Sequence, residues 1–251
     1  MTLIRYSGYM QDRELLIRDK YAGNREVDLS EDLARLERGE PLAYVIGWIP
    51  FLGLRIGLDS RPLIPRPETE WWTEELCVHL SERFGDRPFS FLDLCAGSGA
   101  IGLAILARFP HAHVTFSEVI PEHSVQIQHN LKRNALDASR ATVVSNDLFE
   151  ALPDKRFDCI ATNPPYIPSE RTLDSSVTLY EPGKALFSGE DGLVLIRRIA
   201  GEVEEYLLPS GELWMECDVT NIEEAQKLLT ARTEIRTDLY GRPRVVVGYY
   251  K

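Results

Sequence analysis

From Phe89 onward, short apolar segments alternate with longer segments whose apolar residues recur at helical spacing. Seven segments have strand character: residues 89–94, 113–119, 141–145, 157–163, 211–217, 235–239 and 244–250. Helices are expected between them, over residues 100–109, 121–136, 191–207 and 221–231. This order predicts an α/β fold, in which a doubly wound, Rossmann-like sheet of seven mostly parallel strands carries helices on both faces. Gly241 and Pro243 lie in the short connection between the last two segments, which predicts a C-terminal antiparallel hairpin.

The sequence before this sheet divides into two smaller parts. Leu29, Leu33 and Leu36 fall on one helical face, so a small helical segment is expected there. The apolar alternation that follows predicts a β-hairpin, and Pro67 suits the first position of a long helix. We therefore expect a short N-terminal helical region at residues 1–40, a β-hairpin linker at residues 41–66 and the catalytic domain at residues 67–251.

Composition limits the classes of partner. The 251 residues carry 28 basic and 39 acidic side chains, a formal net charge of −11. Because a protein that follows a phosphate backbone normally has an excess of Lys and Arg, we expect no direct nucleic-acid binding. No apolar run approaches the roughly 18 residues of a membrane span, and no secretory signal is visible. The four cysteines are widely spaced, so we expect buried thiols, no metal site and a cytoplasmic location.

A glycine-rich turn joins the first strand of the sheet to its helix. Its residues are Asp93, Leu94, Cys95, Ala96, Gly97, Ser98 and Gly99. Such small residues let the backbone come close to a ligand at the carboxyl edge of the sheet. Glu118 ends the next strand, where a carboxylate can bind two ribose hydroxyls, and Asp147 follows the third strand, where it could reach an adenine amino group. This arrangement predicts a cofactor that contains a nucleoside.

Two nucleoside-containing cofactors are compatible with this turn. Gly97 to Gly102 also spells G-x-G-x-x-G, the pattern of nicotinamide dehydrogenases, whose dinucleotide needs a helix N-terminus at its pyrophosphate. S-adenosylmethionine has no phosphate and carries a sulfonium cation, which an acidic residue such as Asp93 suits. The glycine turn alone does not decide between them.

The tetrapeptide Asn163-Pro164-Pro165-Tyr166 follows the fourth strand, at the same edge of the sheet. Two successive prolines fix φ and supply no N–H, so the loop is stiff and presents mainly acceptors. A substrate –NH2 can donate one hydrogen to the side-chain oxygen of Asn163 and the other to the Pro164 carbonyl, while Tyr166 stacks on a flat amide or base. We therefore expect these four residues to catalyse transfer of a methyl group from S-adenosylmethionine to a planar nitrogen, mainly by positioning it.

At this point the sequence resembles the HemK/PrmC family of protein-glutamine methyltransferases, which modify the glutamine of the Gly-Gly-Gln tripeptide in class 1 peptide chain release factors. The resemblance runs from about Gly39 to the C-terminus, through the segments GEPLAYVIGWIPFLGLRI, LIPRPETE, FLDLCAGSGAIGLAI, NDLF, FDCIATNPPYIP, YEPGKALFSGEDGL and DLYGRPRVVVGYY. It implies the S-adenosylmethionine-dependent methyltransferase fold, with a release factor as protein substrate. The residues implied in cofactor binding are Cys95 through Gly99, Glu118, Asp147 and Leu148, and those implied in holding the glutamine amide are Asn163 to Tyr166.

The resemblance also implies that residues 66–70 and Glu181-Pro182 form walls of the site, although a helix start and a turn explain them equally well. Three features depart from the family: the shorter N-terminal region, Cys95 in place of a usual glycine, and the sequence CDVTN after GELWME. We expect a monomer. The alternatives are an amino-methyltransferase acting on adenine or cytosine in nucleic acid, a methyltransferase for a glutamine of another protein such as a ribosomal protein, and a cofactor-binding protein that has lost catalysis.

Overall fold

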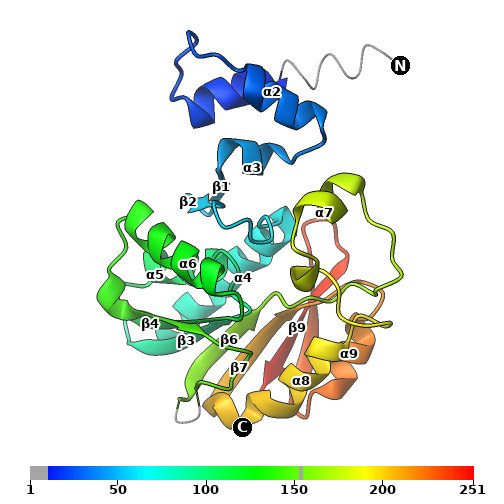
Figure 1. Ribbon diagram of the computed structural model, residues 1–251. Helices are drawn as coiled ribbons and strands as arrows, with labels where there is room; N and C mark the ends of the chain where they lie inside the picture. Colours follow the sequence, from blue (N-terminus) through cyan, green and yellow to red (C-terminus); the bar gives the residue numbers. More distant parts are fainter. Residues whose placement is uncertain (1–10, 153–154) are drawn as a thin grey trace.

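The computed structural model describes residues 11–152 and 155–251, and it is built around one sheet of seven strands (Figure 1). The strands are β3 (Phe89–Leu94), β4 (Ala112–Glu118), β5 (Ala141–Ser145), β6 (Phe157–Thr162), β7 (Leu207–Glu216), β8 (Arg232–Thr237) and β9 (Pro243–Tyr249). Their order in space is β5-β4-β3-β6-β7-β9-β8. The first five strands in this order, from β5 to β7, each run parallel to the next. Strand β9 pairs antiparallel with both β7 and β8. The predicted doubly wound sheet and its C-terminal hairpin are confirmed.

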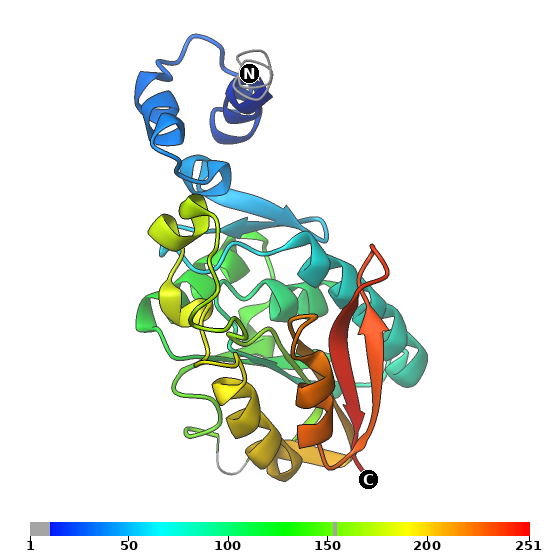
Figure 2. The same ribbon diagram turned by 90° about the vertical axis from the view of Figure 1, so that its right-hand side faces the viewer.

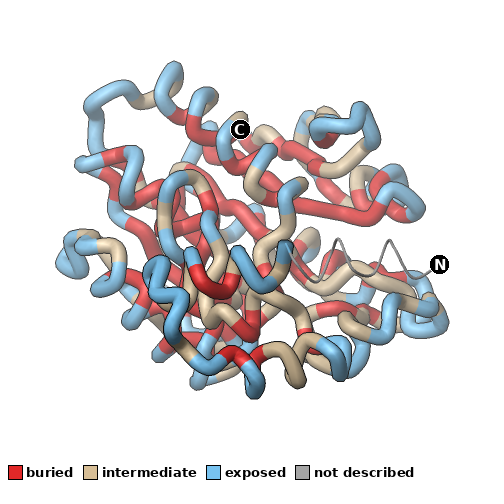
Figure 3. The backbone as a smooth tube through the Cα atoms, turned by 90° about the horizontal axis from the view of Figure 1, so that it is seen from above, coloured by how far each residue is buried: buried red, intermediate tan, exposed pale blue. Residues whose placement is uncertain are grey.

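Helices cover both faces of this sheet. Helices α4 (Pro67–Phe84), α5 (Ala100–Arg108) and α6 (Pro121–Arg133) lie on one face, and α8 (Val194–Glu202) and α9 (Ile222–Leu228) lie on the other (Figures 1 and 2). The first face packs side chains such as Trp72, Leu103 and Phe116, and the second packs Ile196 and Met215. Because successive strand residues point to opposite faces and both faces are covered, the central strands β3 and β6 are buried along almost their whole length. Figure 3 shows this buried interior, with exposed residues at the turns and outer helices.

The N-terminal part lies apart from the sheet, at the top of Figures 1 and 2. It contains helical residues 11–15, a π-helical turn (Leu16–Lys20), α2 (Ser30–Glu37) and α3 (Leu42–Ile46), followed by the hairpin β1 (Trp48–Phe51) and β2 (Leu54–Gly57). Leu16, Ile17, Leu29 and Val45 form a small core of their own. The predicted hairpin is confirmed. Residues 1–10 of the expected helical region lie outside the described residues. The division of the chain into domains stays a prediction.

The hairpin is fastened to helix α6 by amide side chains. Gly57 N donates to Asn130 Oδ1 (2.8 Å), and Asn130 Nδ2 donates to the carbonyls of Gly57 (3.2 Å) and Ser98 (3.0 Å). A Cβ atom on Gly57 would lie 2.8 Å from Asn130 Oδ1, so only glycine permits this approach. Because Asn130 bonds both the hairpin and the glycine-rich turn, it fixes residues 58–65 beside the carboxyl edge of the sheet.

Element ends differ from the sequence expectation where side chains bond the backbone. Helix α6 stops at Arg133 because Asn134 Nδ2 donates to the carbonyl of Asn130 (2.8 Å) and Ala135 takes a positive φ of 51°. The helix expected over residues 191–207 is shorter. Helix α8 ends at Glu202, a 3₁₀ turn follows over Val203–Tyr206, and β7 begins at Leu207. Helix α7 (Ser175–Tyr180) was not predicted, since six residues show no helical period, and Asp174 caps it. No helix within the described ranges is long and apolar enough to cross a membrane.

The tightest packing contact between α5 and the sheet gives a stability prediction. A Cβ atom on Gly102 would lie 2.3 Å from Cε1 of the buried Phe116 ring, whereas one on Gly201 in α8 would meet nothing within 4 Å. Gly102→Ala should therefore lower the free energy of unfolding by about 1–3 kcal/mol, because the ring must move in a close-packed core. Gly201→Ala is the matched control and should raise it by up to about 1 kcal/mol through helix propensity. Urea unfolding measures both, and equal effects of the two substitutions would contradict this packing.

Candidate active site

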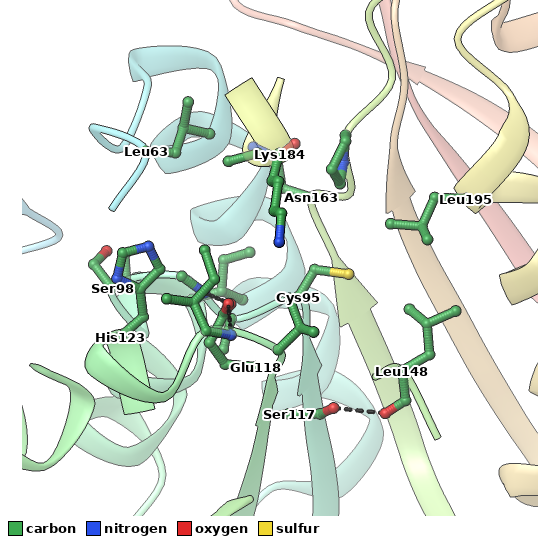
Figure 4. A pocket seen from close by; sticks show the side chains of 18 of the residues that line it. Leu63, Cys95, Ser98, Ser117, Glu118, His123, Leu148, Asn163, Lys184 and Leu195 are labelled. Carbon is green, nitrogen blue, oxygen red and sulfur yellow. Dashed lines mark hydrogen bonds between the residues drawn. The ribbon is translucent and has the colours of Figure 1, made fainter. Parts of the chain in front are cut away.

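The carboxyl ends of β3, β4 and β6 open onto a cavity of about 330 Å³ (Figure 4). Among the predicted site residues, its lining includes Cys95, Ala96, Gly97, Ser98, Glu118, Asp147, Leu148, Asn163 and Pro165. A second cavity of about 150 Å³ adjoins it and is lined by Pro164 and Tyr166 among others. Asn163 lines both cavities, so it stands where they meet. The structure thus gathers these residues at one edge of the sheet, as the order of strands predicts.

The glycine-rich turn is built from left-handed backbone. Cys95, Gly97 and Gly99 have φ values of 59°, 54° and 82°. The turn is tied to the neighbouring strand, because Ala96 N donates to the carbonyl of Ser117 (3.0 Å). A Cβ atom on Gly97 would meet no protein atom within 4 Å, while one on Gly99 would press against Ile127 at 3.0 Å. Gly99 is therefore required for packing, and Gly97 leaves its backbone open to the cavity it lines.

Glu118 links the end of β4 to this turn. Its Oε2 accepts from Gly97 N (2.7 Å) and its Oε1 accepts from Ile120 N (2.9 Å). Burial raises the pKa of Glu118, and the backbone N–H donors oppose that rise. A carboxylate has about four lone-pair sites, so after these two bonds each oxygen can still accept a hydroxyl hydrogen from a ligand in the cavity. Figure 4 shows the Glu118 side chain in the lining.

Of the two other predicted acidic residues, Asp93 lies outside the cavity lining and Asp147 is part of it. Asp93 is 1% exposed, is absent from the lining of both cavities, and accepts from Gly102 N (2.8 Å), so it supports the turn from behind. Burial raises its pKa to about 8, with the nearby charge of Glu118 adding to the effect and the Gly102 N–H opposing it. Asp147 lines the cavity and pairs with Arg198 at 3.0 Å.

The Asn163–Tyr166 loop is held at both ends. Asn163 Nδ2 donates to Thr69 Oγ1 (3.1 Å), and Tyr166 Oη donates to Glu216 Oε1 (2.9 Å). Asn221 Nδ2 also donates to the carbonyl of Tyr166 (3.0 Å). No donor within the described residues contacts Asn163 Oδ1, which leaves this oxygen available to a substrate amide.

An ion pair joins the two expected wall segments: Arg66 lines the second cavity, whereas Glu181 and Pro182 are not among the lining residues of either cavity. Arg66 donates to Glu181 Oε1 (2.6 Å), and Glu181 Oε2 accepts from Ile64 N (3.1 Å). Glu181 is buried, so this ion pair joins the start of α4 firmly to the segment after α7.

Several lining or supporting residues were not singled out from the sequence. Leu63, His123 and Lys184 line the larger cavity, and Glu216 holds the loop from behind. His123 Nδ1 lies 2.9 Å from Ser60 Oγ, its Nε2 has no partner within the described residues, and burial lowers its pKa. Lys184 belongs to the segment YEPGKALF, which could have drawn attention to it, whereas nothing in the sequence marks His123.

Known proteins similar to this chain are methyltransferases. The family model for the methyltransferase small domain matches residues 73–180. The release factor glutamine methyltransferase of Lactococcus lactis subsp. lactis is 30% identical over 238 residues, which are 92% of this chain and 85% of that protein. The release factor glutamine methyltransferase of Bordetella pertussis is 36% identical over 222 residues, 86% of this chain and 80% of that protein.

Solved structures agree in fold. A methyltransferase from Pyrococcus furiosus superposes with a TM-score of 0.58 at 15% identity, covering 88% of this chain and 98% of its own. The catalytic domain of hMettl16, in complex with MAT2A 3'UTR hairpin 1, gives a TM-score of 0.57 at 17% identity, covering 80% of this chain and 76% of its own. Identities this low establish the methyltransferase fold alone.

The buried Asp93 gives a prediction about pH. Because its pKa is raised to about 8 in the native protein from an ordinary 3.8, the native state keeps a proton that the unfolded chain releases. Between about pH 4 and pH 8 the contribution of Asp93 to stability therefore falls as pH rises. Asp93→Asn removes this titration, so its free energy of unfolding relative to wild type should increase with pH by up to about 1.4 kcal/mol per unit.

Urea unfolding at a series of pH values measures this difference. Asp86→Asn, at an exposed carboxylate, is the control and should give a curve parallel to wild type. A constant difference between Asp93→Asn and wild type over the whole range would show that Asp93 ionises normally.

Proposed function

The chain belongs to the release factor glutamine methyltransferase family, and from that premise we propose that it methylates the glutamine of the Gly-Gly-Gln tripeptide in class 1 peptide chain release factors. The methyl donor is S-adenosylmethionine, and the acceptor is the side-chain amide nitrogen. The observation that carries the proposal is the position of Asn163, which lines both cavities and keeps Oδ1 without a partner within the described residues. A cytoplasmic monomer is part of the same proposal.

The larger cavity has the groups that S-adenosylmethionine requires. Glu118 would accept from its ribose hydroxyls, and the open backbone at Gly97 would admit its amino-acid portion, with Cys95 and Ser98 beside it. Asp147 and Leu148 would hold the adenine, the first at its amino group and the second against its face. Glu118, a lining carboxylate without an ion pair among the described residues, suits a cationic ligand. When bound there, S-adenosylmethionine supplies the electrophilic methyl group.

The loop residues position the acceptor nitrogen. A glutamine amide that enters through the smaller cavity can donate one hydrogen to Asn163 Oδ1 and the other to the Pro164 carbonyl, which holds the –NH2 group in a fixed plane. Pro164 and Pro165 cannot rotate about φ, so the main chain that carries the Pro164 carbonyl is stiff. No side chain has to act as a dedicated base, because a methylated nitrogen that still carries its extra proton is a strong acid and releases it to water or to the loop carbonyl.

The lining of the smaller cavity favours a peptide over a nucleic acid. It is mostly apolar, and Arg66 is its one charged residue within the described part of the chain. Arg66 is already paired with Glu181, so no free cation remains there to bind a phosphate. An aliphatic glutamine side chain fits such a cavity better than a nucleotide does.

The function is tested by methyl transfer from labelled S-adenosylmethionine to a purified class 1 release factor. We expect label on the Gly-Gly-Gln glutamine, and none on a release factor in which that glutamine is replaced. Label that persists after the replacement would place the reaction on another residue. No label on either protein, with cofactor binding verified by calorimetry, would rule out release factors as the substrate.

The role of Glu118 is tested by cofactor binding. Glu118→Gln keeps the shape but removes the charge and turns one acceptor into a donor, so we expect the Kd for S-adenosylmethionine to rise about 5- to 150-fold, or about 1–3 kcal/mol. Titration calorimetry measures it. Glu122→Gln, at an exposed carboxylate in the first turn of α6, is the matched control and should leave the Kd unchanged. Equal affinity of wild type and Glu118→Gln would remove Glu118 from the cofactor site.

A further inference from the structure

One buried carboxylate lies behind both ends of the Asn163–Tyr166 loop. Glu216 is the last residue of β7, which pairs parallel with β6, and it is 1% exposed. Its Oε2 accepts from Thr69 Oγ1 (2.7 Å) and Trp72 Nε1 (2.7 Å), and its Oε1 accepts from Tyr166 Oη (2.9 Å). Three neutral donors thus surround it, two of them from helix α4 and one from the loop itself.

The single hydroxyl hydrogen of Thr69 sets the direction of the chain of hydrogen bonds. A carboxylate can only accept, so Thr69 must donate its hydrogen to Glu216, and a bond to a charged acceptor is the stronger choice. The Thr69 oxygen is then free only to accept, and its remaining neighbour is Asn163 Nδ2 at 3.1 Å. The order of donation is therefore from Asn163 to Thr69 and from Thr69 to Glu216.

This order fixes which way the Asn163 amide faces. If the amide were turned by 180°, Oδ1 would lie against the Thr69 oxygen, and no hydrogen would be left between two acceptors. Such an unmade bond in a buried site costs more than a normal hydrogen bond gains. Asn163 is thus held with Nδ2 toward Thr69 and Oδ1 away from it, which is the orientation that a substrate –NH2 group needs.

We propose that Thr69 and Glu216 are positioning residues for methyl transfer, which orient the Asn163 amide so that its oxygen faces the substrate. The proposal rests on the proposed function, because it assigns a role to the same site. It also gives a reason for the sequence Arg66-Pro67-Glu68-Thr69-Glu70: the helix start places the Thr69 hydroxyl between the loop and the end of β7. Tyr166 donates to the other oxygen of Glu216, which fixes the position of the far end of the loop relative to Asn163.

The first test is steady-state methylation of the release factor by Thr69→Val, which replaces the hydroxyl by a methyl group of similar size. We expect kcat to fall about 10- to 100-fold, because the Asn163 amide loses the bond that orients it. The KM for the release factor and the Kd for S-adenosylmethionine should change less than about threefold, since the cavities keep their shape. Thr69→Ser restores the hydroxyl and should recover kcat to within about threefold of wild type.

Thr73→Val is the matched structural control. Thr73 lies one turn along the same helix, is equally buried, and donates to the carbonyl of Thr69 (2.7 Å) without contacting Glu216 or Asn163. It should lose thermal stability like Thr69→Val and keep kcat to within about twofold. Equal losses of kcat in the two valine variants, or no recovery in Thr69→Ser, would overturn the proposal.

A second readout does not depend on the substrate. In ¹⁵N-labelled protein, the side-chain NH2 signals of Asn163, assigned by their loss in Asn163→Asp, should show slowed hydrogen exchange in wild type and Thr73→Val and faster exchange in Thr69→Val. If wild type shows this protection but methylates no release factor, the proposed function fails and the orienting role of Thr69 stands. If the release factor is methylated and the protection is the same in all three proteins, the orienting role fails alone.

Discussion

The parallel register of β4, β3, β6 and β7 brings four segments that are distant in sequence to one edge of the sheet. Main-chain and side-chain bonds then join these segments across the edge: the turn after β3 bonds β4, and Ser117 Oγ donates to the carbonyl of Leu148 (2.6 Å; Figure 4). Asn163 follows β6 directly, and Glu216 ends β7 beside it. A shift of one register position in any of these strands would turn the side chains at its end to the other face and separate the cofactor cavity from the loop.

Three buried carboxylates at this edge have no direct ion pair with Lys or Arg within the described residues. Glu118 and Glu216 instead accept from N–H and O–H donors, whereas Asp93 accepts only from Gly102 N and its Oδ1 has no partner among the described residues; burial raises the pKa of all three. Neutral donors favour the charged form of Glu118 and Glu216, whereas Asp93, with a pKa raised to about 8, is mostly protonated at neutral pH and adds little negative charge. The family to which the chain belongs, and not the glycine pattern, implies S-adenosylmethionine rather than a dinucleotide.

The sequence predicts the sheet and those cavity-lining residues that lie directly at the strand ends, because each depends on local pattern. Alternating segments locate the strands, and the position of Glu118 at a strand end follows from them. The same reasoning misses the contact between Thr69 and Glu216, which are 147 residues apart and meet only through the packing of α4 against the end of β7. It expects Asp93 to face the cofactor, whereas the side chain is turned toward Gly102 N, because strand position gives the edge but not the rotamer. Only the assembled fold supplies such contacts.

The N-terminal part is connected to the substrate side of the site rather than to the cofactor side alone. Tyr180 Oη at the end of α7 donates to the carbonyl of Arg38 (3.0 Å), and Tyr180 packs on the cluster of Tyr44, Leu58 and Ile64. Ile64 is in turn bonded to Glu181, whose partner Arg66 lines the smaller cavity. The N-terminal helices and the wall beside Asn163 are therefore joined by a continuous series of contacts. The cavity around Glu118, in contrast, is supported by the sheet, through the bonds of Glu118 to Gly97 N and of Ala96 N to Ser117.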